Sequence, residues 1–167
     1  MDREVLAVVM ARAGSVGLPG KALRELLGRP VIAYTFDHLR ESQRITRSVV
    51  SSDDAAILHL GREAGIEVIN RPAELATSTS ATDPVLRHAV RALYANAGEF
   101  TTESQKHGDD VAEKSVPPRL RREKWPWAVV MLYGNVPVRR GGMIDRCIEM
   151  LFDTQCDSVQ TVAGVGK

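Results

Sequence analysis

The sequence has little cysteine, almost no excess charge of either sign and no long apolar run. Only Cys147 and Cys156 are present, so neither a disulfide scaffold nor a four-ligand zinc site is expected. The 22 basic and 21 acidic residues leave a net charge of +1, which argues against a generally basic nucleic-acid binder and against an acidic tail. No apolar run approaches the ~20 residues of a membrane-spanning helix, and Met1–Glu4 leads into a strand-like run without a signal-peptide pattern. We therefore expect a cytoplasmic, reduced protein with no membrane or nucleic-acid partner.

The composition that is present is ordinary for a globular protein. Hydrophobic residues make up 44% and charged residues 26% of the 167 residues. This length fits one domain spanning 1–167 and suffices to bury a core. One segment departs from the pattern: residues 98–124 are rich in both acidic and basic side chains. The segment exceeds the ~12–15 residues usual for a loop in a compact domain, so we expect an exposed polar insertion there.

Short apolar runs alternate with segments of helical periodicity along most of the chain. This alternation predicts βαβ units and an α/β fold with a mostly parallel sheet covered on both faces. Ligands of such sheets bind outside the carboxyl ends of the strands, so the candidate loops are 11–21, 51–54, 70–82 and 133–140. Strands are expected at 5–10, 48–51, 67–69, 128–132 and 158–162, and helices at about 30–39, 55–64, 81–94 and 142–152.

The loop after the first strand, Ala11–Lys21, contains the residue types that bind a polyphosphate. Its glycines allow backbone N–H groups to approach a phosphate, Arg12 and Lys21 supply positive charge, and Ser15 supplies a hydroxyl donor. The loop has neither the Gly-Lys-Ser/Thr ending of a Walker A loop nor the glycine spacing of a dinucleotide-binding loop. Taken alone, it is equally compatible with a flexible turn carrying solvated charges.

Several motifs, taken in order, change that balance. Ala11–Ala22 matches Ala-Arg-x-x-Ser-Lys-Gly-Leu-Pro-x-Lys-Asn, and Val50–Asp53 matches Val-Ser-Thr-Asp. Arg71–Ala76 reads Arg-Pro-Ala-Glu-Leu-Ala, and Pro137–Arg139 fits the end of Gln-Pro-Thr-Ser-Pro-Leu-Arg. Asp157–Val159 fits a later Asp-Ser-Val strand. In this order the motifs resemble the acylneuraminate (CMP-sialic acid) cytidylyltransferase family, which is related to the Kdo cytidylyltransferases and continues beyond the point matched by the end of this sequence.

The resemblance implies a three-layer Rossmann-like nucleotidyltransferase fold. It also implies transfer of CMP from CTP to an acidic, sialic acid-like sugar with release of pyrophosphate. Mg²⁺ would bind and neutralise the triphosphate, and catalysis would depend mainly on positioning and on stabilising the developing charge. The expected partners are therefore CTP and a sugar acid, with a homodimer as a further expectation from the family.

The same resemblance assigns roles residue by residue. Arg12 and Lys21 would hold the phosphates as the catalytic pair. The Tyr133–Pro137 stretch resembles the Gln-Gly-Asp-Glu-Pro loop of the Kdo enzymes, in which the Asp binds metal; here Asn135 would be a weak Mg²⁺ ligand, and a simple turn residue is favoured. The expected nucleotide-binding residues are Ala11, Arg12, Gly14, Ser15, Gly17, Lys21, Arg71, Thr79 and Thr82.

Four departures from the family pattern support a second hypothesis. Val16, Ala22, Ser78 and Tyr133 stand where the family has Lys, Asn, Asp and Gln. Each change removes a charged or hydrogen-bonding group, and a charge-assisted hydrogen bond is worth about 1.5–3 kcal/mol. The alternative, favoured by Val16, Ala22, Asn135 and the later family segments that this sequence does not contain, is a catalytically impaired nucleotide-binding or interaction protein that retains the fold. A molybdopterin- or terpenoid-precursor-type nucleotidyltransferase is less compatible with the Arg71–Ala76 match.

Other candidate sites have simpler interpretations. Asp53 and Asp54 could bind metal, but a cap for the helix that begins at Ala55 is favoured. The basic and aromatic stretch 119–127 is similar to single-stranded nucleic-acid binders, yet we favour a solvated charge run whose tryptophans pack at the edge of the next strand. The histidines at 38, 59, 88 and 107 show no ligand spacing, and Cys147 is expected to pack within a helix.

Overall fold

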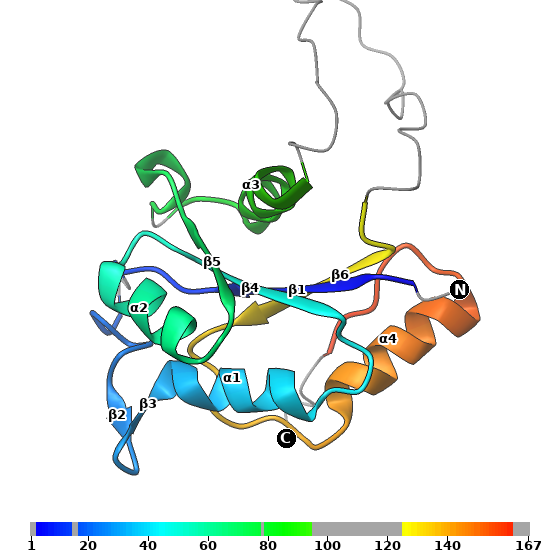
Figure 1. Ribbon diagram of the computed structural model, residues 1–167, viewed down its shortest axis with the longest axis horizontal. Helices are drawn as coiled ribbons and strands as arrows, with labels where there is room; N and C mark the ends of the chain where they lie inside the picture. Colours follow the sequence, from blue (N-terminus) through cyan, green and yellow to red (C-terminus); the bar gives the residue numbers. More distant parts are fainter. Residues whose placement is uncertain (1–2, 15–16, 78, 95–124, 162–167) are drawn as a thin grey trace, which may run out of the picture.

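A parallel β-sheet is the centre of the fold. The computed structural model describes residues 3–14, 17–77, 79–94 and 125–161. Among them, four strands pair in the order β5-β4-β1-β6, and each pairing is parallel (Figure 1). This confirms the predicted α/β class with a mostly parallel sheet. The strands are β1 (Val5–Met10), β4 (Arg47–Ser52), β5 (Glu67–Asn70) and β6 (Ala128–Tyr133).

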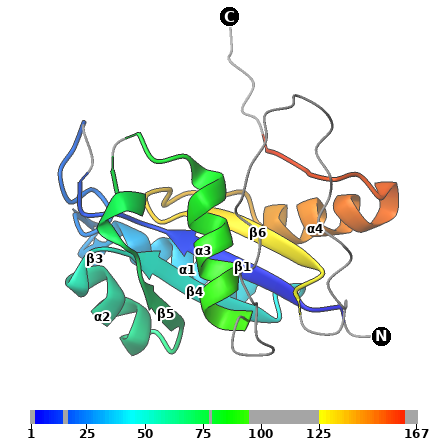
Figure 2. The ribbon, with the colours of Figure 1, turned by 90° about the horizontal axis from the view of Figure 1, so that it is seen from above.

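Helices cover both faces of this sheet and give three layers. One face is covered by α1, α2 and α4, and α3 crosses the opposite face (Figures 1 and 2). Among the described residues, no helix has the length and apolarity needed to cross a bilayer. The helices are α1 (Val31–Glu41), α2 (Ala55–Glu63), α3 (Thr82–Tyr94) and α4 (Met143–Thr154).

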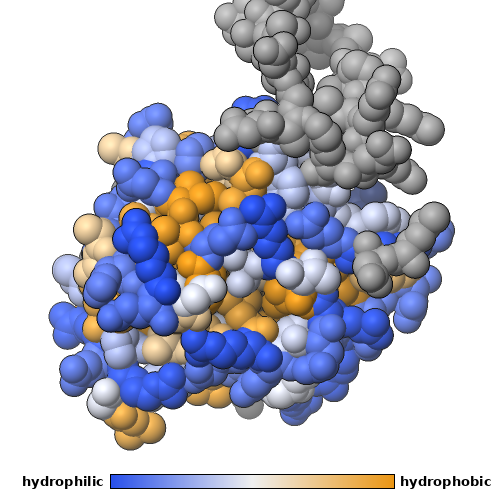
Figure 3. Space-filling view, in the orientation of Figure 1, coloured by the Kyte–Doolittle hydropathy of each residue, from blue (hydrophilic) through white to orange (hydrophobic). Residues whose placement is uncertain are grey.

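Burial on both faces explains why the sequence of the central strand β1 is a continuous apolar run. All six of its residues are buried, since successive side chains point to opposite covered faces. Ala7 and Val9 pack in the cluster that contains α1 and α2, whereas Leu6 and Val8 pack against α3. On the face shown in Figure 3, polar and charged side chains cover much of the surface, and apolar side chains are visible between them.

A short antiparallel hairpin between β1 and α1 was not predicted. It consists of β2 (Glu25–Leu26) and β3 (Arg29–Pro30), joined by Leu27 and Gly28. Both turn residues have positive φ, 51° and 75°, which is the requirement of a type I′ turn. Pro30, which was expected to begin the helix at about 30–39, therefore lies in β3 and immediately precedes α1.

The expected strand at 158–162 is wrong for the residues that the structure describes. Residues 158–161 belong to no strand, and most of their side chains are exposed. A residue with strand propensity such as Val159 forms a strand only where its backbone pairs with a neighbouring strand. No described strand pairs with it here. Val162 and the expected insertion at 98–124 lie outside the described residues.

Asp54 caps the helix α2, as expected. Its Oδ1 accepts hydrogen bonds from the backbone N–H groups of Ala56 at 2.8 Å and Ile57 at 3.4 Å. These bonds satisfy two of the donors that the first turn of a helix leaves without a partner. At the other end, Gly65 adopts a positive φ of 73°, which is typical of the residue that ends a helix.

We expect Asp54→Ala to lower the free energy of unfolding by about 1 kcal/mol because two backbone donors lose their acceptor. Urea denaturation would measure this. Asp54→Asn is the matched control, since it keeps a side-chain oxygen at the cap. An equal loss in both variants would contradict the capping role.

Candidate functional site

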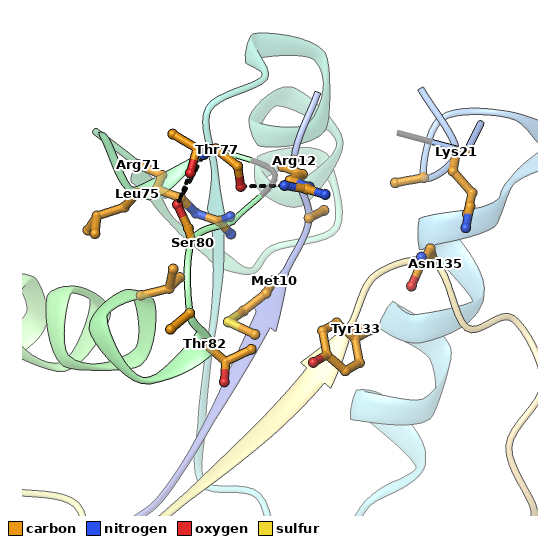
Figure 4. Close-up of a pocket in the computed structure, with 15 residues that line it drawn as sticks. Met10, Arg12, Lys21, Arg71, Leu75, Thr77, Ser80, Thr82, Tyr133 and Asn135 are labelled. Carbon is orange, nitrogen blue, oxygen red and sulfur yellow. Dashed lines mark hydrogen bonds between the residues drawn. The ribbon is translucent and has the colours of Figure 1, made fainter. Parts of the chain in front are cut away.

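A cavity of about 430 Å³ opens at the carboxyl ends of the strands. The loops that follow β1, β5 and β6 converge on it, as expected for a ligand site in a parallel sheet. Arg12, Arg71 and Thr77 lie on one side of this pocket, and Lys21 and Asn135 lie on the other (Figure 4). The volume is within the range of small-molecule binding sites.

The loop after β1 is held in place from two directions. The backbone N–H of Ala13 donates to Oδ1 of Asp53 at 3.1 Å, which ties the loop to the end of β4. Nη1 of Arg12 donates to the backbone carbonyl of Thr77, so this side chain bridges the loops after β1 and β5 (Figure 4). Asp53 therefore fixes the loop, a role that neither the metal nor the cap hypothesis for the Asp53–Asp54 pair included.

Arg71 forms part of the floor of the pocket. Arg71 is only 6% exposed. Nε donates to Oγ of Ser51 at 3.2 Å, and Nη2 donates to the Ser51 carbonyl at 2.5 Å. Burial lowers the pKa of Arg71, the nearby Asp53 carboxylate opposes this shift, and the positive charge of Arg12 adds to it. Two arginines thus face the same pocket at some electrostatic cost, which a bound anion would relieve.

The loop after β6 supplies the remaining wall. Tyr133 and Asn135 both line the pocket, and Gly134 between them donates its N–H to the Met10 carbonyl at 3.0 Å. A Cβ atom on Gly134 would lie only 3.1 Å from Cβ of Ala11 and from Cδ1 of Ile32. The absence of a side chain at Gly134 therefore allows this loop to approach the end of β1.

The residues that the structure describes offer few groups that could hold a metal ion. They contain no cluster of three His, Cys, Asp or Glu side chains with the arrangement of a metal site. Asn135 is the predicted ligand, and its carboxamide lies in the pocket. A divalent cation there would have to take most of its ligands from phosphate oxygens and water, which is the usual pattern for Mg²⁺.

Most of the predicted site residues meet at this pocket. Gly14 is exposed and is not among the lining residues. Thr79 is also exposed, and its hydroxyl lies 3.3 Å from the Thr77 hydroxyl. Ser15 lies outside the described residues. The predicted residues that line the pocket are Ala11, Arg12, Gly17, Lys21, Arg71, Thr82 and Asn135.

Two hydroxyl residues of the pocket were missed. Thr77 and Ser80 line it, and their hydroxyl oxygens lie 2.7 Å apart. The Ser80 hydroxyl also donates to the Glu74 carbonyl at 3.3 Å, which ties this loop to the short 3₁₀ helix η1 (Ala73–Leu75). The signal was present in the sequence as four consecutive hydroxyl residues at 77–80.

The two tryptophans and Cys147 have packing roles. Trp125 stacks on Tyr94 with ring centroids 6.2 Å apart, and Trp127 meets Phe152 edge-on at 5.1 Å. Both tryptophans therefore contact aromatic side chains of the helices α3 and α4. Cys147 is half-buried in α4, as expected. Residues 119–124 and His107 lie outside the described part of the chain.

Comparison with known proteins supports the motifs quoted above. Several curated relatives match part of the chain, and three of them illustrate the range. The 3-deoxy-manno-octulosonate cytidylyltransferase of Acidobacterium capsulatum is 30% identical over 55% of this chain. The N-acylneuraminate cytidylyltransferase of Escherichia coli O18:K1:H7 is 28% identical over 60%, and the CMP-N,N'-diacetyllegionaminic acid synthase of Legionella pneumophila is 43% identical over 46%. The matches span between 24% and 38% of the length of these relatives.

Solved structures share the fold at low sequence identity. A CMP:2-keto-3-deoxy-manno-octonic acid synthetase complexed with CTP superposes with a TM-score of 0.62 at 17% identity, covering 91% of this chain and 48% of the other. A cytidylyltransferase from Leptospira borgpetersenii gives 0.58 at 15% identity, covering 92% and 50%. These likenesses confirm the predicted Rossmann-like nucleotidyltransferase fold.

The family model named Cytidylyltransferase matches residues 6–97. The matched segment is more than half of the chain. It includes the end of β4, and it includes the loops after β1 and β5, which both supply residues that line the pocket. The chain therefore belongs to the cytidylyltransferase family.

Proposed function

We propose that this chain binds CTP in the pocket at the carboxyl ends of the strands. The observation that supports this most directly is the gathering of Arg12, Lys21 and Arg71 around one cavity. None of the ion pairs found among the described residues involves these three side chains. A triphosphate would supply the negative charge that this arrangement lacks, through charge-assisted hydrogen bonds.

The proposed reaction is transfer of CMP to an acidic sugar. A hydroxyl oxygen of the sugar would attack the α-phosphorus of CTP and lose its proton to solvent, and the bond from that phosphorus to the pyrophosphate oxygen would break. Arg12 and Lys21 would hold the phosphates and stabilise the charge that develops on the leaving pyrophosphate. The Thr77, Ser80 and Thr82 hydroxyls would bind the nucleoside side. Mg²⁺, when bound, would neutralise triphosphate charge, with Asn135 as a weak protein ligand.

The choice of substrate rests on the relatives and on the motifs. The relatives' names specify 3-deoxy-manno-octulosonate, N-acylneuraminate and N,N'-diacetyllegionaminic acid, which are all acidic sugars. We propose a sialic acid-like sugar because Arg71–Ala76 matches the acylneuraminate motif. A cytoplasmic location and a homodimer belong to the same proposal and rest on the family resemblance.

Two residues favour the alternative, a nucleotide-binding protein with impaired catalysis. Ala22 and Tyr133 both line the pocket, at positions where the family has Asn and Gln. Each replaces a side-chain amide with a group that forms fewer hydrogen bonds. This alternative predicts CTP binding without pyrophosphate release.

Calorimetric titration with CTP tests the proposal, with and without Mg²⁺ and with ATP, GTP and UTP as controls. We expect selective binding of CTP, strengthened by Mg²⁺. Failure to bind any of the four nucleotides would contradict the proposed function. Where CTP binds, a pyrophosphate-release assay with sialic acid and with Kdo then separates an active enzyme from an impaired one.

A further inference from the structure

A further arginine, Arg139, lies outside the pocket and is bound to the backbone of the loop after β6. Nη1 of Arg139 donates to the Val136 carbonyl at 2.8 Å and to Oγ1 of Thr35 at 3.1 Å. Its Nη2 donates to the Tyr133 carbonyl at 2.9 Å. The guanidinium therefore connects both ends of the segment 133–136 to helix α1.

Helix α1 contributes two polar side chains to the same arrangement. Thr35 is fully buried, and its hydroxyl lies 3.3 Å from the Tyr133 carbonyl and 3.4 Å from the Val136 carbonyl. Nε2 of His38, one turn further along α1, lies 3.3 Å from the Pro137 carbonyl. Thr35 and His38 thus make three contacts with the loop, which is about a hundred residues away in sequence.

The bonding of Arg139 differs from that of an ordinary surface arginine. None of the ion pairs among the described residues includes Arg139, and burial lowers the pKa of its guanidinium. A half-buried charge without a carboxylate is costly unless its hydrogen bonds are satisfied. The neighbouring Arg140 is exposed and shows no comparable set of contacts. The Arg139 side chain therefore stabilises the loop after β6 and does not only add to the surface charge.

Holding the loop also determines what lines the pocket. The carbonyl of Tyr133 is bound to Arg139, whereas its side chain lines the pocket together with Asn135 (Figure 4). Rotation of this segment would move both side chains at once. We propose that Arg139 is a positioning residue: it holds the segment 133–136 against α1, so that Tyr133 and Asn135 form one wall of the pocket, and it does not touch the ligand itself. The effect on nucleotide affinity rests on the proposed function, whereas the effect on the loop does not.

The loop can be observed directly by ¹⁹F NMR of protein labelled with 3-fluorotyrosine. The chain has three tyrosines, and Tyr133→Phe identifies the resonance of Tyr133. We expect Arg139→Leu to shift or broaden that resonance while the resonance of Tyr94, at the end of α3, stays in place as a control for folding. An unchanged Tyr133 resonance in a folded Arg139→Leu protein would overturn the proposal.

Nucleotide affinity provides the second readout. We expect Arg139→Leu to weaken CTP binding about tenfold. An effect of this size corresponds to the loss of about one well-formed hydrogen bond. Arg139→Lys should restore part of the affinity, and Arg140→Leu is the matched control that should bind as the unmutated protein does. Equal weakening by Arg140→Leu would indicate a general charge effect and contradict the role of Arg139.

A further variant covers the case in which Arg139→Leu does not fold. Thr35→Val keeps the size of the side chain but removes the hydroxyl that contacts Arg139, and it should move the same Tyr133 resonance. A folded Thr35→Val protein with an unchanged resonance would count against the arrangement. If the unmutated protein binds no CTP, the proposed function fails, and the NMR result alone decides the role of Arg139.

Discussion

Lys21→Ala is expected to weaken CTP binding by about ten- to a hundredfold, because one charge-assisted hydrogen bond to phosphate is worth about 1.5–3 kcal/mol. Arg12→Ala should weaken it at least as much. Arg12 also bridges to the Thr77 carbonyl, so its removal releases the loop after β5 as well as a positive charge. Calorimetric titration at fixed ionic strength measures both effects.

The control for these variants is Arg62→Ala. Arg62 is exposed on α2, away from the pocket, so its removal changes the net charge by the same amount without touching the site. Higher salt should weaken CTP binding less in Lys21→Ala than in the unmutated protein, since one charge contact is already lost. Affinities of Lys21→Ala and Arg12→Ala that match the Arg62→Ala control would refute a phosphate-binding role for this loop.

Gly134→Ala is expected to destabilise the fold and to disturb the pocket together. The added Cβ would lie 3.1 Å from both Ala11 and Ile32, and overpacking of this kind typically costs about 1–3 kcal/mol. Replacing a glycine also lowers the conformational entropy of the unfolded chain, but this stabilises the folded protein by only about 0.4–1 kcal/mol. The net result should be a lower free energy of unfolding in urea.

A double variant tests whether crowding is the cause. Ile32→Val removes Cδ1, one of the two atoms that would lie 3.1 Å from the added Cβ, and by itself costs about 0.5–1.5 kcal/mol. We expect the Gly134→Ala, Ile32→Val protein to lose less stability than the sum of the single variants. Simple additivity would contradict crowding by Cδ1 of Ile32. Gly141→Ala is the matched control, because a Cβ there would have no neighbour within 4 Å.

The regular elements of this fold could be predicted because each one repeats a pattern. Strand β1 is buried on both faces and reads as an unbroken apolar run, and α3 alternates buried and exposed residues with helical spacing. The hairpin β2–β3 could not be predicted in this way, since strands of two residues contain no period. The strand expected at 158–162 had suitable residues, but strand formation also depends on a partner that local sequence does not specify.

The site was predictable to the extent that topology and residue type decide it. Arg12, Arg71 and Asn135 follow three different strands, and parallel pairing brings those strand ends to the same edge of the sheet. The contacts that each side chain makes were harder to predict. Arg71 donates to Ser51 beneath the pocket, and Arg139 binds carbonyl groups rather than a ligand. Those roles depend on side-chain directions that emerge only after the elements pack.

The pairing of β1 with β6 has a consequence for the order in which the site forms. β1 joins β4, its near neighbour in sequence, on one side, but on the other it joins β6, which follows more than a hundred residues later. Closing so large a loop costs more chain entropy than the β1–β4 pairing does. During synthesis, Arg12 and Arg71 can come together before Tyr133 and Asn135 have left the ribosome. We therefore expect the wall formed by Tyr133 and Asn135 to be the last part of the pocket to assemble, so that ligand affinity would report completion of folding.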